Sequence, residues 1–293
     1  MLSPQNGAGS GVSGMINLVV ALPAEARPLI AHYRLTDKTT MGAFRLYRRA
    51  DVSLIISGPG KIAAAAATAL LAGQNTSGEQ AVWLNIGIAG HATHDTGVSL
   101  LAHRITDHAT GKSWYPPRLF GLETASASLI TVDVPENSYH QDAAYDMEAS
   151  GYYAVAGGFS TAELVQCFKV VSDNREQPTA TVTAERCAQL LAGKLEEIEQ
   201  LLGALAAVSQ DCNSWHAAPA GLERLSCQWH FTVSQQHQLA ELARRWKVLM
   251  PDRPLWLGEL DSKKNAAGVL QCLQQHLDSL APGLPQATHA PRV

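Results

Sequence analysis

The fold is decided by Ala144-Tyr-Asp-Met-Glu-Ala-Ser150 and by Phe168-Lys-Val-Val-Ser-Asp173, which follows it. In the first segment, the acidic Asp-Met-Glu sequence precedes an apolar stretch with helical character. The second reads as a short β-branched strand that ends on Ser172 and Asp173. Ligand sites of helix-covered sheets cluster at the carboxyl ends of the strands. The pattern therefore favours an α/β protein that carries Asp173 at such an edge.

The composition is that of a globular protein. The chain has 293 residues, 46% of them hydrophobic, which is enough for a sizeable core. The net charge of -4 and the lack of a long basic block argue against nucleic acid as a partner. Residues 1–14 lack the pattern of a signal peptide, and no apolar run approaches the ~20 residues of a membrane span. We expect a cytoplasmic protein without a membrane partner.

The cysteines give no sign of a disulfide framework, because they are five in number and lack paired spacing. A reducing compartment fits this pattern. Cys227 and His230, with His216 and His237 nearby, are zinc-ligand types. Their spacing is not that of a familiar zinc finger, and we interpret them as core or surface residues. We expect no metal and no cofactor.

Short β-branched runs alternate with alanine-rich runs over most of the chain, as in a sheet covered by helices. The expected strands are 16–21, 44–49, 52–57, 82–88, 98–105, 128–132 and 164–171. The expected helices are 24–33, 61–72, 149–156, 184–207, 235–249 and 265–280. The composition changes after residue 207. The expected organisation is a flexible segment 1–14, a catalytic domain 15–207, a helical extension 208–281 and a loose tail 282–293.

Several segments resemble, in order, those of the nucleoside phosphorylase and nucleosidase superfamily, and in their motifs they are most similar to methylthioadenosine/adenosylhomocysteine nucleosidases. The segments are Leu22–Ile30 with Glu25, the glycine turns Ser57–Ala64 and Asn85–Gly90, Asp146–Ala149, and the strand that ends at Asp173. The resemblance covers roughly residues 15–205. It implies an α/β fold with a central mixed sheet flanked by helices, cleavage of the N-glycosidic bond of a nucleoside, with a purine expected, and a homodimer.

The residues themselves suit that chemistry, which needs an acid for the leaving base and a carboxylate that positions water. The resemblance implies Asp173 as the general acid, Glu148 as the acceptor of ribose hydroxyl hydrogen bonds and Glu25 as the group that orients water. The other expected substrate contacts are Met147, Ala89, Gly90, Ser172 and Gly58. A glutamate at a helix start can also be a dipole partner only, and Ser-Asp after a strand can be a cap.

Two positions depart from the pattern of these nucleosidases. Ile88 stands where relatives have a small hydroxyl residue, and Pro135 stands where an aromatic ring for base stacking is expected. Tyr139 and His140 are the candidates that could restore stacking. A nucleoside-binding or scaffold protein without catalytic activity therefore remains an alternative.

A phosphorylase is the other alternative. We find no convincing cluster of arginines and serines for phosphate around residues 57–61 and 85–91, and this favours hydrolysis. Phosphate would become a credible partner if Arg27 pointed into the site together with Lys61.

Overall fold

The computed structural model describes residues 15–75, 79–118, 121, 123–179, 182–216, 218–251, 253–255 and 259–280. The expected flexible segment 1–14 and the expected tail 282–293 lie outside the described residues. The chain divides into two compact units, Met1–Asp211 and Cys212–Val293.

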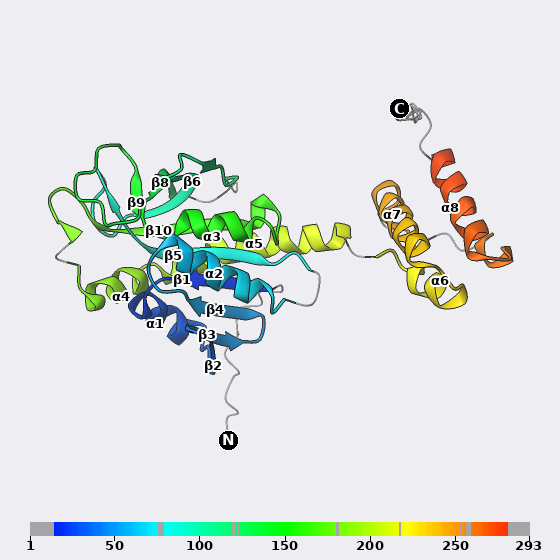
Figure 1. The fold of residues 1–293 in the computed structure, drawn as a ribbon, viewed down its shortest axis with the longest axis horizontal. Coiled ribbons are helices and arrows are strands. Elements are labelled where there is room, and N and C mark those ends of the chain that lie inside the picture. The colour runs from blue at the N-terminus through cyan, green and yellow to red at the C-terminus, as the bar shows by residue number, and fades with distance from the viewer. Residues whose placement is uncertain are drawn as a thin grey trace, which may run out of the picture. The chain divides into compact units, whose positions relative to one another are not determined.

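A ten-stranded sheet forms the centre of the first unit (Figure 1). Five strands, in the order β10-β6-β8-β9-β5, close into a ring because β10 also pairs with β5. The order continues from β5 through β1, β4 and β3 to β2, while β7 pairs with β6. The strands are β1 Ile16–Val20, β2 Asp37–Met41, β3 Phe44–Arg49, β4 Val52–Ile56, β5 Val82–His91, β6 Ser99–Asp107, β7 Ser113–Trp114, β8 Ala125–Thr131, β9 Ala144–Asp146 and β10 Val165–Asp173.

Apolar strands at the centre of the sheet are buried on both faces. All residues of β1 and β10 are buried. Val19 of β1 packs in one cluster, and Leu18 and Val20 pack in another on the opposite face. The first cluster contains residues of helices α2 Lys61–Ala72 and α3 Ala149–Ala156, and the second contains residues of α1 Pro23–His32, α4 Ala184–Ala192 and α5 Leu195–His216. Strands 1, 4, 5 and 10 run parallel, so their carboxyl ends share one edge.

The expected fold class is confirmed, with two local corrections. The helix expected over 184–207 is two helices, because α4 ends at Ala192 with Gly193 as its C-cap. The second helix, α5, runs on to His216. The second glycine segment, Asn85–Gly90, is not a turn and lies entirely within β5. The first glycine segment is a turn, since Gly58 and Gly60 have φ values of 79° and 98°.

The second unit has a hydrophobic core of its own. Its helices are α6 Leu222–Gln228, α7 Val233–Leu249 and α8 Ala266–Leu280, and short 3-10 turns are found at Leu260–Ser262 here and at Ala162–Leu164 in the first unit. Thr232 caps α7 in a capping box with Gln235. Trp246 packs with Leu270 and Leu273, so the apolar stripes of α7 and α8 cover one another. No helix among the described residues is both long and apolar enough to cross a membrane.

Candidate active site

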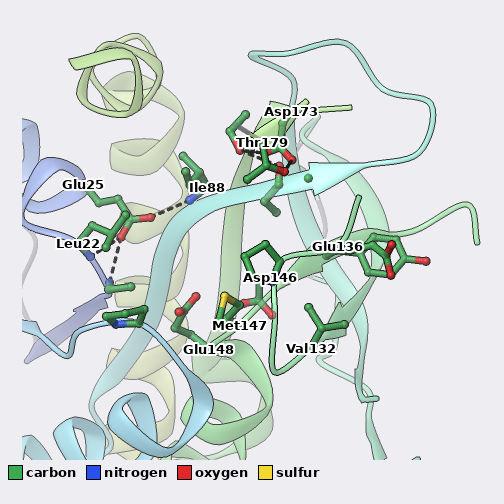
Figure 2. Close-up of a pocket in the computed structure, with 17 residues that line it drawn as sticks. Leu22, Glu25, Ile88, Val132, Glu136, Asp146, Met147, Glu148, Asp173 and Thr179 are labelled. Carbon is green, nitrogen blue, oxygen red and sulfur yellow. Dashed lines mark hydrogen bonds between the residues drawn. The ribbon is translucent and has the colours of Figure 1, made fainter. Parts of the chain in front are cut away.

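A cavity of about 220 Å³ opens where β1, β5 and β10 end and β9 leads into α3 (Figure 2). Three carboxylates, Glu25, Glu148 and Asp173, approach it from different segments. The described residues that line it are Ala21, Leu22, Glu25, Pro59, Ile88, Ala89, Gly90, Val132, Pro135, Glu136, Tyr145, Asp146, Met147, Glu148, Ser172, Asp173 and Thr179. Every site residue expected from the sequence is among them except Gly58, which belongs to the turn beside Pro59.

The Glu25 carboxylate is fixed by backbone N–H groups. Its Oε2 accepts from Ala21 at 3.0 Å and from Leu22 at 2.8 Å, and its Oε1 accepts from Ile88 at 3.0 Å. An ionised carboxylate has about four acceptor sites, so one remains for a ligand or a water molecule. Burial raises the pKa of Glu25, and the Lys169 ammonium and the three N–H groups offset only part of that effect.

Gly87 makes room for this carboxylate. A Cβ at Gly87 would lie 2.8 Å from Glu25 Oε1 and 3.4 Å from Lys169 Nζ. The glycines of β5 therefore serve close approach rather than a turn. Ile88 donates its backbone N–H to Glu25. This contact does not require the small hydroxyl side chain that relatives have at this position.

Glu148 lies at the N-cap of α3 and reaches back to the first glycine turn. Its Oε1 accepts the N–H of Gly60 at 2.8 Å, and its side chain lines the cavity. Burial, followed by the neighbouring Asp146 carboxylate, raises the pKa of Glu148 to about 7 against the opposing effects of Lys169 and the Gly60 N–H. This glutamate therefore holds its proton more tightly than an ordinary glutamate does.

Lys169 is a functional candidate that the sequence interpretation missed. It is 2% exposed in the middle of β10, and its Nζ lies 2.9 Å from Asp146 Oδ2. Burial lowers the pKa of Lys169, but the Asp146 and Glu148 carboxylates outweigh burial, and its pKa lies above the ordinary value. The signal in the sequence was a lysine inside an otherwise buried strand, where a charge needs a partner.

Asp173 ends β10 and is held by hydroxyl groups. Its Oδ2 accepts from Thr179 at 2.6 Å and from Tyr139, and its Oδ1 accepts from Ser172. The carboxyl group is buried yet faces the cavity. A β-bulge at Ser172 lets Asp173 pair with Gly90, which brings both residues to the same wall.

Neither candidate for base stacking lines the cavity. His140 is exposed, and Tyr139 is buried behind the wall with its hydroxyl on Asp173. Pro135 lines the cavity, and so does Tyr145 of β9, an aromatic side chain that the sequence interpretation did not single out. The sequence could have indicated Tyr145, because it directly precedes the Asp146-Met-Glu148 motif.

The two cations considered for phosphate lie away from the cavity. Arg27 is exposed and pairs with Glu185 at 3.5 Å. Lys61 Nζ pairs with Asp107 at 2.9 Å and with Asp133 at 3.0 Å. The described residues that line the cavity include no arginine and no lysine.

Comparison with known proteins finds no matching family model and no matching curated protein, but solved structures match the first unit's fold. The 5′-methylthioadenosine/S-adenosylhomocysteine nucleosidase of Colwellia psychrerythraea, in complex with adenine, is 19% identical with a TM-score of 0.52 over 66% of this chain and 95% of that chain. The corresponding Helicobacter pylori nucleosidase is 12% identical with a TM-score of 0.53 over 64% and 97%. Futalosine hydrolase of Helicobacter pylori is 15% identical with a TM-score of 0.52 over 66% and 100%. The nucleosidase-like fold is thereby confirmed.

Proposed function

We propose that this chain hydrolyses the N-glycosidic bond of a nucleoside or nucleoside-like metabolite with a purine base. One observation carries the proposal: Glu25, Glu148 and Asp173, which are far apart in sequence, meet around one cavity, and each has a different set of partners. The fold is shared with nucleosidases whose structures contain adenine or a nucleoside analogue.

The three carboxylates take different tasks in this proposal. Asp173 gives a proton to the leaving base, which lowers the barrier by neutralising the departing nitrogen. Glu148 keeps an oxygen free of the Gly60 contact for the ribose hydroxyls. Glu25 holds water through its remaining acceptor site, on the carboxylate that the backbone has already fixed. Cleavage passes through an oxocarbenium-like sugar, and the acidic wall favours the positive charge that develops there.

Hydrolysis is supported over phosphorolysis by the placement of the cations. A phosphate dianion needs arginines, lysines or a cluster of N–H groups. Arg27 and Lys61 are paired with carboxylates elsewhere. The Ile88 N–H and the N–H groups of Ala21 and Leu22 are already donated to Glu25.

A panel of purine and pyrimidine nucleosides, including 5′-substituted ones, tests the proposal when base release is measured with and without phosphate. We expect release that does not depend on phosphate. Release that requires phosphate would assign a phosphorylase. Binding of nucleosides without release would assign the non-catalytic alternative.

A further inference from the structure

Tyr139 sits behind the wall of the cavity in an unusual backbone conformation. Its φ is 46°, in the left-handed region that non-glycine residues rarely adopt. It is 1% exposed, and its hydroxyl donates to Asp173 Oδ2. A strained conformation persists only where the surroundings impose it, and such positions gather at functional sites.

Contacts on both sides of Tyr139 impose this conformation. Glu136 Oε1 accepts the N–H groups of Asn137, Ser138 and Tyr139 at 2.9, 2.6 and 3.3 Å, which closes a tight turn over these residues. Arg175 Nη2 donates to the Tyr139 carbonyl at 2.6 Å. The segment that carries Tyr139 is thus tied to the loop that follows β10.

The Tyr139 ring also packs closely against its neighbours. It packs edge-on against Tyr145 at 5.7 Å between ring centroids. Gly90 leaves the space, since a Cβ there would lie 2.6 Å from the Tyr139 hydroxyl and 2.8 Å from Asp173 Oδ2. The same glycine therefore lets the phenol and the carboxylate meet.

These contacts leave the Asp173 carboxyl group little freedom. Hydroxyls of Tyr139, Thr179 and Ser172 occupy three of its roughly four acceptor sites. Thr179 and Ser172 line the cavity, whereas Tyr139 is buried and is not among the described lining residues. Of these three donors, Tyr139 is the one outside the described lining, so it holds the carboxyl group without occupying the side that faces the cavity.

We propose that Tyr139 is the positioning residue of Asp173, fixing the plane of the carboxyl group for proton transfer to the leaving base. This inference rests on the proposed function, because it assigns the direction from which Asp173 works in that reaction. Tyr139 does not touch the substrate, and its effect passes through Asp173.

The test compares Tyr139→Phe with the wild-type protein and with Tyr33→Phe. Phenylalanine keeps the packing against Tyr145 and removes only the hydroxyl. Tyr33 follows α1, and its buried hydroxyl has no hydrogen-bond partner among the described residues, so Tyr33→Phe controls for loss of a buried phenol. We expect Tyr139→Phe to lower kcat roughly 10- to 100-fold with KM changed less than about threefold, and Tyr33→Phe to leave both unchanged.

A double-mutant cycle separates positioning from a structural role. In a protein that already carries Asp173→Asn, adding Tyr139→Phe should lower kcat by less than about twofold further. A merely structural tyrosine would lower kcat by the same factor in both backgrounds, and that result would overturn the inference. Wild-type turnover in Tyr139→Phe would overturn it as well.

A failure of the proposed function can be distinguished from a failure of the positioning claim. A wild-type chain that releases no base from any nucleoside refutes the function, and the positioning claim is then decided by crystal structures of the wild type and Tyr139→Phe. A rotated Asp173 carboxyl group in the variant supports the inference. The same carboxyl orientation in both structures overturns it.

Discussion

Asp173 combines a buried place at the end of β10 with a carboxyl group that faces the cavity. Asp173→Asn keeps the size of the side chain but removes the transferable proton. We expect turnover to fall roughly 10²- to 10⁴-fold, with nucleoside binding retained. Base release measures the first and calorimetry the second. Asp142→Asn is the matched control, because Asp142 is exposed and its side chain accepts a hydrogen bond from Thr93. This variant should keep full turnover. An unchanged rate in Asp173→Asn would remove this residue from the mechanism.

Glu148 offers a test that contains its own control. Glu148→Gln replaces a charged acceptor by a neutral amide, and a hydrogen bond to a charged group contributes roughly 1.5–3 kcal/mol. Ribosides should therefore lose roughly 10- to 100-fold in kcat/KM, whereas 2′-deoxyribosides should lose much less. Equal losses for both sugars would contradict ribose recognition by this carboxylate.

The raised pKa of Glu148 also predicts a pH dependence. Only the ionised form accepts two hydroxyl hydrogen bonds, so riboside affinity should rise as pH increases from 6 to 8 through the pKa of about 7. Stability changes in the opposite sense: the folded state binds this proton more tightly than the unfolded state, so the contribution of Glu148 to stability is lost as pH rises from about 4.5 to about 7. Dissociation constants measured at several pH values check the first statement. A flat profile in the wild type, or an unchanged slope in Glu148→Gln, would contradict it.

Single residues were predictable where a strand end or a helix start placed them. Glu25 and Asp173 reach one cavity because β1 and β10 are parallel strands that end at a common edge, which periodicity and order already indicate. Glu148 reaches the same cavity from β9, which runs antiparallel to β5. Lys169 was not predictable as a partner of Asp146, because the pairing depends on β9 and β10 both lying beside β5. The direction of the Tyr139 ring depends on the turn that the Glu136 side chain closes. No sequence motif predicts that turn.

At the scale of elements, the contact between α2 and α3 fixes the surroundings of Glu148. Gly151 of α3 touches the first residue of α2 so closely that a Cβ would lie 1.9 Å from the Lys61 carbonyl oxygen. Lys61 directly follows Gly60, whose N–H binds Glu148. The spacing of the two helices and the position of Glu148 are therefore linked.

Gly151→Ala should push the two helices apart, because the clash is with backbone. We expect a loss of stability of about 1–3 kcal/mol and weaker riboside binding, measured by chemical unfolding and calorimetry. Gly203→Ala is the matched control: Gly203 is exposed in α5, a Cβ there meets nothing within 4 Å, and the change should stabilise by up to about 1 kcal/mol. Equal effects of the two substitutions would refute the packing argument.

Apolar segments with clear ends were predicted well, and polar or very short ones were not. The helices over 61–72 and 149–156 have the expected bounds, and so does the strand over 44–49. Strand β2 was missed because its polar sequence carries no apolar alternation, and β9 was missed because it has only three residues. Asn85–Gly90 looked like a turn because its glycines suggested flexibility, whereas they serve close packing against Glu25 and Tyr139.

At the scale of the molecule, the two units have separate cores. The described residues of the second unit bury Leu225, Trp246 and Leu273 against one another. These apolar side chains of the second unit are thus buried within that unit. Their number does not by itself require a second protein chain to cover them. The homodimer expected from the resemblance stays a prediction.

Separate cores predict separate unfolding. Calorimetry of the full chain should show two transitions, and a chain truncated after residue 216, which keeps α5 whole, should retain one of them together with base release. The hydrophobic face of α5 that packs under the sheet, from Ile198 to Leu205, stays in the truncated chain. A single cooperative transition in the full chain, or an unfolded truncated chain, would contradict this view.

The ring of strands has a further consequence, for self-association. Pairing of β10 with β5 removes the edge at β10, so in the described sheet the ladder ends only at β2 and at the two-residue β7. An unpaired edge can recruit another chain and begin aggregation. Strand β2 carries Asp37, Lys38 and two threonines, and all four residues are exposed. The charges of Asp37 and Lys38 at that long edge disfavour pairing with the edge strand of a second molecule.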